Sequence, residues 1–407
     1  MKIPNTKYLV LADQALFSGL SFVTTIWIAR NVDAVSFGIY SAWVLAIYLF
    51  VSAIGAWVIQ PFQIRYNKLE HTKEYLTFVF WGQFTMMVVA AGLIFLFNYL
   101  FDYQEIGTII CYGAGFVFYD YFRKTLLVMN RIWTALVLNI FTAVLTLVGL
   151  AYLTWNHTFS IEKFLKFSSV IYFSIFMYSL IYFKPLTKNI SGICNHFSYH
   201  MRQGKWFFMT AISQWWAGNL FVVASGIYLG PKALGALRLA QSLFGILNVI
   251  LQTFENYVLP QTASRIHTSI PDGINYLKNL SVKAAWIFLP LLLVTFFFAK
   301  DILVLAGENQ YAEFYFVVQG LSLLYVLIYL SQPLRCLIRS LEFNEAFFKG
   351  YLITLAFALI FSHLILSNFG LYGVLTGLII SQVILIAYWS LILHSKNKQI
   401  WKSFISY

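Results

Sequence analysis

The stretch IWTALVLNIFTAVLTLVGLAYL, residues 132–153, is almost wholly apolar and contains no charged side chain. An α-helix needs about 20 residues to cross the hydrocarbon core of a bilayer, so this stretch predicts a transmembrane helix. The whole chain has the same character. Of its 407 residues, 60% are apolar and 10% are charged, whereas soluble domains have about 45–50% apolar and about 25% charged residues. We therefore expect an integral membrane protein without a sizeable water-soluble domain.

Similar apolar runs, separated by polar breaks, follow one another along the chain. They predict an all-α fold of about twelve transmembrane helices, with boundaries accurate to about four residues. The expected spans are Tyr8–Ile28, Ile39–Ile59, Leu76–Phe101, Ile106–Leu126, Ile132–Leu153, Phe167–Phe183, Trp206–Leu229, Ala236–Leu259, Val282–Ala299, Phe314–Ser331, Tyr351–Ser367 and Leu371–Leu393. The first run is not expected to be a cleaved signal peptide, because Asp13 and Gln14 interrupt it and no small-residue cleavage site follows.

The basic residues fall mainly in alternate loops, and this predicts the orientation. If both termini lie on one side, most of the 27 lysines and arginines lie on that side as well. Those left on the opposite side are Arg30, Lys163, Lys166, Lys232, Arg238 and Lys300. Positively charged loops stay in the cytoplasm, so both termini are expected to be cytoplasmic. The same bias accounts for the net charge of +12, and no nucleic acid is expected as a partner.

A polar cytoplasmic linker, residues 184–205, divides the predicted helices six and six. We expect an N-lobe of residues 1–205, which includes the linker, and a C-lobe of residues 206–407. An even number of helices in each lobe gives both the same orientation. Such a parallel repeat has a pseudo-two-fold axis along the membrane normal, and in transporters the substrate site lies in a central cavity between the lobes.

The two halves also share sequence features. A shift of 200 residues places Gln14 on Gln214, at the first polar position of a small and polar helix face in each half. Ser36-Phe37-Gly38 corresponds to Ala233-Leu234-Gly235. Pro61 and Arg65, after the second span, correspond to Pro260 and Arg265, after the eighth. These correspondences favour an internal repeat.

The eighth span carries the sharpest polar pattern. Arg238, Gln241, Gly245, Asn248, Gln252 and Glu255 follow one another at steps of three or four residues, which places them on one helical face. Polar groups are disfavoured in hydrocarbon, so this polar stripe is expected to face other helices or water. One interpretation is hydrogen bonding between helices. The other, which we favour, is a wall of the central cavity.

Further charged residues lie in other spans, each with two interpretations. Asp120, Arg123 and Lys124 are close enough along one helix for the two basic groups to neutralise the acid; they form either a helix end that reaches the interface or part of the cavity. Asp13 is either a helix-end carboxylate beside Lys2 and Lys7 or a proton site. Arg30 and Arg238 lie near the outer ends of their helices, as interfacial anchors or phosphate contacts.

Motifs typical of enzymes are missing. The sequence has no phosphate-binding GxxxxGK[ST] loop and no HExxH metal motif, and Cys111, Cys194 and Cys336 are too far apart to suggest a metal site. We expect no enzyme, no metal and no cofactor. A coupling ion, H⁺ or Na⁺, is the one exception, with Asp13 and Glu255 as the candidates for carrying it.

The N-terminal sequence resembles the bacterial polysaccharide flippases, including those for O-antigen. The resemblance is carried by Asp13-Gln14-Ala15-Leu16-Phe17-Ser18-Gly19, Ala29-Arg30 and Phe37-Gly38-Ile39-Tyr40. The Leu-Gly that usually follows Ala-Arg is replaced here by Val32-Asp33. These flippases belong to the multidrug/oligosaccharidyl-lipid/polysaccharide exporter (MOP) superfamily.

The resemblance implies a multi-pass protein of the bacterial inner membrane that moves undecaprenyl-diphosphate-linked oligosaccharide to the periplasmic leaflet by alternating access. Its partners would be this lipid-linked sugar, membrane lipids and polysaccharide assembly proteins. Arg30 and Arg238 would then pair with the diphosphate. Gln241, Asn248 and Gln252 would bind sugar hydroxyls, with Gln214, Asp120 and Arg123 as further cavity residues.

Two competing functions remain open at this point. A cation-coupled multidrug exporter of the same superfamily would share the architecture, although acidic cavity residues would suit its cationic drugs better. A membrane-embedded polysaccharide polymerase or ligase is less favoured, because such enzymes usually need a long outer loop. The longest outer loop expected here is about Thr154–Lys166.

Overall fold

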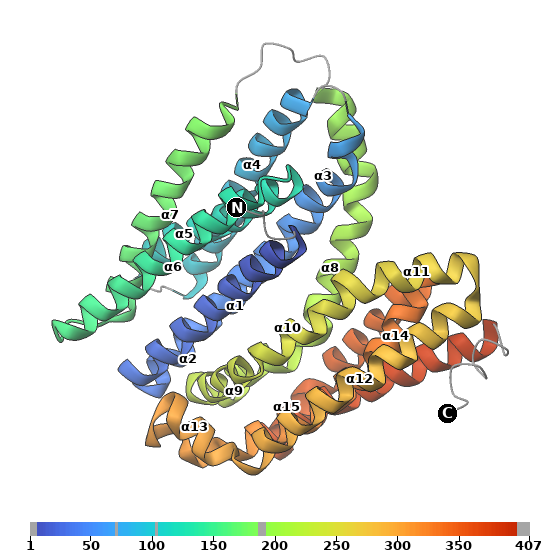
Figure 1. Ribbon diagram of the computed structural model, residues 1–407. Helices are drawn as coiled ribbons and strands as arrows, with labels where there is room; N and C mark the ends of the chain where they lie inside the picture. The colour runs from blue at the N-terminus through green and yellow to red at the C-terminus, as the bar shows by residue number, and fades with distance from the viewer. Residues whose placement is uncertain (1–5, 70–71, 102–104, 186–192, 397–407) are drawn as a thin grey trace. The chain divides into compact units, whose positions relative to one another are not determined.

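The computed structural model describes residues 6–69, 72–101, 105–185 and 193–396 (Figure 1). Within these ranges the regular secondary structure is helical throughout, and no strand occurs. Nine of the helices described are long and apolar enough to cross a membrane. The predicted all-α fold is therefore confirmed.

Among its described residues, the first half contains seven α-helices and two short irregular ones. They are α1 (Thr6–Asn31), α2 (Ala34–Ile54), the π-helical turn η1 (Gly55–Ile59), α3 (Gln60–Arg65), the 3₁₀ turn η2 (Tyr66–Lys68), α4 (Thr72–Phe101), α5 (Ile106–Val128), α6 (Ile132–Trp155) and α7 (Ile161–Phe183). In this half α1 packs against α6, and α5 packs against α7 and α4.

Among its described residues, the second half contains eight α-helices and two short irregular ones. They are α8 (Ile193–Leu229), α9 (Pro231–Leu243), α10 (Gly245–Thr253), the π-helical turn η3 (Phe254–Val258), α11 (Leu259–Thr268), α12 (Ile270–Phe297), α13 (Ala299–Gly307), the 3₁₀ turn η4 (Asn309–Phe314), α14 (Tyr315–Ser340) and α15 (Asn344–Lys396). Helix α15 contains both of the last predicted spans, joined through a kink at Gly370, whose φ is 54°. Here α14 packs against α15 and α12.

Contacts along the chain divide it into two compact units. The first unit comprises Met1–Val32 and Trp43–Ile212, and the second comprises Asp33–Ala42 and Ser213–Tyr407. The first turns of α2 therefore belong with the C-terminal helices. Gly38 of α2 makes this packing possible, because a Cβ atom there would lie 1.9 Å from the carbonyl oxygen of Pro231 on α9. Gly235 of α9 is its counterpart, since a Cβ there would lie 2.9 Å from the carbonyl oxygen of Ala34.

Both units contain the same irregularity after their second apolar run. The π-helical turn η1 ends one residue before Gln60-Pro61, and η3 ends one residue before Leu259-Pro260. A proline removes a backbone donor and crowds the preceding turn, and a wider turn accommodates it. The same device at matching places supports the predicted repeat.

Pro61 leaves a backbone carbonyl free to accept a hydrogen bond from a histidine side chain. Because Pro61 has no N–H, the carbonyl of Trp57, four residues earlier, lacks its helical partner. His200 of α8 donates from Nδ1 to this oxygen, at 3.2 Å, and its Nε2 accepts from the hydroxyl of Tyr75 on α4, at 2.8 Å. Tyr75 and His200 are buried. The linker end of α8 is thus attached to α4 and to the turn before α3.

Candidate functional site

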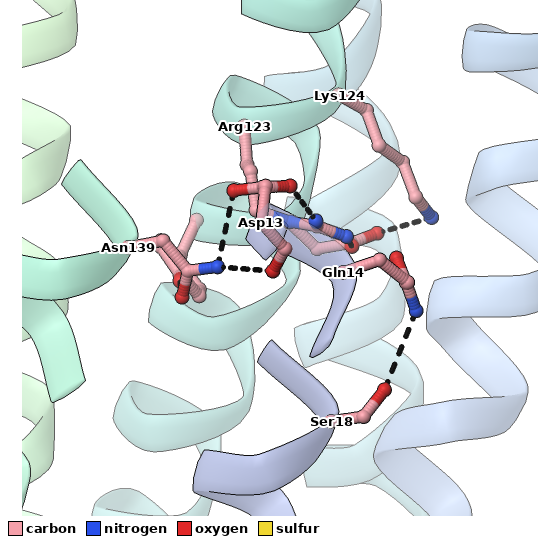
Figure 2. A network of polar contacts seen from close by, with 8 residues as sticks. Asp13, Gln14, Ser18, Arg123, Lys124 and Asn139 are labelled. Carbon is pink, nitrogen blue, oxygen red and sulfur yellow. Dashed lines mark hydrogen bonds and ion pairs between the residues drawn. The ribbon is translucent and has the colours of Figure 1, made fainter. Parts of the chain in front are cut away.

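A buried network of charges lies inside the first unit, among α1, α5 and α6 (Figure 2). Its centre is Asp13 of α1, which has no exposed surface. One carboxylate oxygen, Oδ2, accepts from Nη1 of Arg123 on α5 at 2.5 Å. The Arg123 guanidinium carbon also lies 4.2 Å from the centre of the Phe17 ring. Arg123 is itself buried, so the pair is shielded from solvent on both sides.

Asn139 of α6 completes the coordination of Asp13. Its Nδ2 donates to Oδ1 of Asp13 at 3.1 Å and to the backbone oxygen of Asp13 at 2.8 Å. Its Oδ1 accepts from the hydroxyl of Tyr119 on α5 at 2.8 Å. Asn139 and Tyr119 are buried. The network therefore joins three helices through one carboxylate.

Asp120 extends the network along α5. Its Oδ1 lies 3.7 Å from Nη2 of Arg123, and its Oδ2 lies 2.6 Å from Nζ of Lys124. Two acids and two bases thus meet in one cluster, which has no formal net charge when all four are ionised. Burying an unpaired charge is very costly. A balanced cluster is the form in which a membrane-spanning bundle tolerates four ionisable groups.

The structure corrects one sequence interpretation and confirms another. Asp13 lies about two turns inside α1 and pairs with Arg123, so it is not a helix-end carboxylate; the side chains of Lys2 and Lys7 lie outside the described residues. The expected neutralisation of Asp120 by Arg123 and Lys124 is confirmed. The sequence interpretation missed Asn139. As the one side-chain amide within the charge-free stretch 132–153, Asn139 carried a usable signal, because such groups in a span usually have a partner.

The polar stripe lies on two helices instead of one. The helix expected over residues 236–259 is divided at Phe244, where α9 ends and α10 begins, and again by η3. Arg238 and Gln241 lie on α9, and Nη1 of Arg238 donates to Oε1 of Gln241 at 2.9 Å. On α10, Oδ1 of Asn248 accepts from the Tyr325 hydroxyl of α14 at 3.0 Å.

Four polar residues of the stripe are half-buried: Arg238, Gln241, Asn248 and Gln252. Hydrogen bonding between helices accounts for Asn248 through its contact with Tyr325. A role of the stripe in binding cargo stays a prediction.

Of the remaining predicted residues, the structure describes the side chains of Arg30 and Gln214 and only the backbone of Glu255. Arg30 is exposed in the last turn of α1. Gln214 of α8 is half-buried and donates to the Tyr351 hydroxyl of α15 at 3.4 Å. Glu255 falls in η3, and its side chain lies outside the described part of the chain. Among the residues that the structure describes, no group of three His, Cys, Asp or Glu side chains is arranged to hold a metal ion.

Comparison with known proteins finds likeness in structure alone. No protein family and no curated protein matches the sequence. Among solved structures, the lipid II flippase MurJ in an inward closed conformation is 16% identical, with a TM-score of 0.69 over 98% of this chain and 90% of that chain. An inward-facing multidrug resistance MATE transporter of the MOP superfamily is 14% identical, with a TM-score of 0.68 over 99% and 97%.

A third similar structure is a MOP superfamily transporter from Pyrococcus furiosus, whose binding pocket is described as having reverse polarity. It is 14% identical, with a TM-score of 0.61 over 97% of this chain and 96% of that chain. At such identities the likeness establishes the fold. The chain therefore has the fold of these transporters, whose two-lobe, twelve-helix architecture agrees with the spans that the apolar runs predicted.

Proposed function

We propose that the protein is a flippase that moves undecaprenyl-diphosphate-linked oligosaccharide from the cytoplasmic to the periplasmic leaflet by alternating access. The sugar would be an O-antigen repeat or a similar polysaccharide unit. The protein would act in the inner membrane with both termini in the cytoplasm, alongside polysaccharide assembly proteins. The fold supports a transporter and gives no support to the polymerase or ligase alternative.

The observation that carries the proposal is the charge of the two polar regions. In the first unit, the charges of Asp13, Asp120, Arg123 and Lys124 balance one another. On α9 and α10, the described side chains of the polar stripe are the guanidinium of Arg238 and the amides of Gln241, Asn248 and Gln252, and the acid of the stripe, Glu255, follows them in η3. A cationic guanidinium together with amides suits phosphate and hydroxyl groups, whereas a cationic drug would favour acids.

The chemistry of the cargo explains why a protein is needed. An oligosaccharide on a diphosphate would lose its hydrogen bonds to water in the hydrocarbon core. Each unsatisfied polar group there costs several kcal/mol. Amide and guanidinium side chains replace that water. In this proposal Arg30 and Arg238 contact the diphosphate, and Gln241, Asn248 and Gln252 bind the sugar.

A cation-coupled multidrug exporter is the second candidate, because MATE multidrug transporters share the fold at similar TM-scores. Coupling to H⁺ or Na⁺ is compatible with both functions, with Asp13 and Glu255 as the proposed carriers. Drug susceptibility of a deletion strain distinguishes the two. An exporter predicts hypersensitivity to cationic drugs with normal surface polysaccharide, and a flippase predicts the reverse.

The variants Arg238→Ala and Gln252→Ala test the flippase directly. Each is expected to reduce surface polysaccharide and to accumulate lipid-linked sugar on the cytoplasmic side, with protein abundance unchanged. Lys232→Ala is the matched control, since Lys232 is a basic residue of the same helix α9 that is exposed and pairs with Glu313. Wild-type amounts of surface polysaccharide in both variants would remove the polar stripe from the mechanism.

A further inference from the structure

The second unit contains a cavity that the sequence did not reveal and whose lining mixes polar and apolar side chains. It has a volume of about 250 Å³ and lies among α8, α14 and α15. Its polar lining consists of Gln214, Ser331, Gln332, Arg335, Tyr351, Thr354, Ser381, Gln382 and Trp389. Gly218 also lines it and is exposed, so the cavity reaches the surface of the unit. At about 30 Å³ per water molecule, it has room for about eight waters.

The hydroxyl groups of this lining act as acceptors. Ser331 donates its hydroxyl hydrogen to the backbone oxygen of Ile328 at 2.7 Å, and Ser381 donates to Gly377 at 2.8 Å. Thr354 does the same toward Tyr351 at 2.9 Å. Each hydroxyl has one hydrogen and two lone pairs. With the hydrogens engaged in the helices, lone pairs are left for a ligand.

Gln332 is the strongest indication of a ligand. Its side chain is 4% exposed, and its Oε1 is buried without a hydrogen-bond partner in the described structure. A buried acceptor left unsatisfied is disfavoured. Gln332 lines the cavity, so a rotation of its side chain brings this acceptor to a hydrogen-bond donor inside the cavity and removes the penalty.

The positive charge of Arg335 limits the kind of ligand that the cavity can bind. It lies one helical turn from Gln332 on α14 and lines the same cavity. A metal cation would be repelled by its guanidinium, and no Asp or Glu occurs among the described residues that line the cavity. A sugar hydroxyl donates and accepts at once, so it satisfies both the acceptors and the guanidinium. Tyr351 and Trp389, with ring centres 5.7 Å apart, supply aromatic surface beside these groups.

We infer that this cavity is a binding site for one pyranose ring, neutral or acidic. Ser331, Gln332, Thr354 and Ser381 accept hydrogen bonds from ring hydroxyls, and Arg335 donates to a hydroxyl or carboxylate. The volume admits a single ring. The assignment of this site to one sugar unit of the cargo rests on the proposed function. The assignment of a sugar-binding site does not depend on that function.

Two pairs of matched variants test the site in the full-length protein in detergent. Gln332→Leu and Ser381→Ala remove acceptors from the cavity. Gln319→Leu on α14 and Thr376→Val on α15 are the controls, because both residues lie outside the cavity lining. Thr376 also donates to its own helix, at 2.8 Å to Tyr372, as Ser381 does to Gly377. The probes are glucose, glucuronate and NaCl, and the measurement is the ligand-dependent rise in unfolding temperature.

We expect glucose or glucuronate to stabilise the wild type and both controls. The affinity of Gln332→Leu should fall about tenfold or more, and Ser381→Ala should show a smaller loss in the same direction. Ser381→Ala keeps the test informative if Gln332→Leu does not fold. Equal stabilisation of all five proteins, stabilisation by Na⁺ alone, or no stabilisation by either sugar would each overturn the inference.

A parallel assay of lipid-linked disaccharide movement in vesicles separates this inference from the proposed function. If the wild type moves no lipid-linked sugar but binds glucose or glucuronate through Gln332, the proposed function is wrong and the sugar site stands. If the wild type and Gln332→Leu move the cargo equally well and bind both sugars equally, the function stands and the site is wrong.

Discussion

The substitution Asp13→Asn tests the buried network most sharply, because it removes one charge and almost no volume. At 2.5 Å from Arg123, a unit charge contributes ~7 kcal/mol at an effective dielectric constant of about 20. The carboxylate also has a desolvation cost that the amide avoids, so the net loss is smaller. Breaking a buried pair typically costs about 3–5 kcal/mol. Asp120 remains 3.7 Å from Arg123, so we expect about 3 kcal/mol.

The assay is thermal unfolding of the purified protein in detergent. For a unit of this size, a loss of about 3 kcal/mol lowers the unfolding temperature by about 6–12 °C. Glu162→Gln is the matched control: it makes the same change of acid to amide in the exposed pair with Lys166 on α7, and exposed pairs contribute little. No measurable change is expected for the control.

A second substitution identifies the cause. Arg123→Gln in the Asp13→Asn background removes the uncompensated cation and leaves Asp120 paired with Lys124. The double variant is therefore expected to be more stable than Asp13→Asn alone. An Asp13→Asn protein as stable as the wild type, or a double variant less stable than the single one, would refute the charge-balance reasoning.

Two further outcomes test other contacts. His200→Ala leaves the Trp57 carbonyl and the buried Tyr75 hydroxyl without their partner and should lower the free energy of unfolding by about 3 kcal/mol. His267→Ala removes an exposed ring and should have no measurable effect, so equal stability of the two variants would contradict the assigned contacts. Asp33 accepts from the backbone N–H groups of Val35 and Ser36 at 3.0 and 2.9 Å, and hydrogen bonds from Ser36 hold the pKa of its carboxyl below the usual value. Its contribution is therefore present at neutral pH and lost as the pH falls through this lowered pKa. Asp33→Ala should cost about 1 kcal/mol at neutral pH, and denaturant unfolding at several pH values should show the difference shrinking in acid; a pH-independent difference would argue against the ionised cap.

Hydropathy predicted the membrane-embedded parts of the helices and missed their polar ends. Helix α7 begins at Ile161, six residues before the expected Phe167, because Lys163 and Lys166 interrupt the apolar run without interrupting the helix. The local signal was present, since Ser160 caps this helix by accepting from the Lys163 backbone N–H at 3.2 Å. The start of α12 is similar, with Ser269 as its cap.

Long-range partners could not be predicted in the same way. The charges of Asp120, Arg123 and Lys124 lie one helical turn apart, so their mutual contact follows from spacing. The pairing of Asp13 with Arg123 and Asn139 depends on how α1, α5 and α6 pack, which one sequence does not determine. The cavity around Gln332 has the same origin, because its lining comes from three helices far apart in the chain.

The central claim, that the protein carries a lipid-linked oligosaccharide across the bilayer, is tested most directly with purified protein in sealed vesicles that contain a fluorescent undecaprenyl-diphosphate-linked sugar in both leaflets. A membrane-impermeant quencher reaches only the outer leaflet, so about half of the fluorescence is protected in protein-free vesicles. A flippase removes most of this protection, and we expect Arg238→Ala to remove much less. Protection that stays at one half with the wild-type protein, under imposed H⁺ and Na⁺ gradients as well as without them, would show that the protein does not move this lipid.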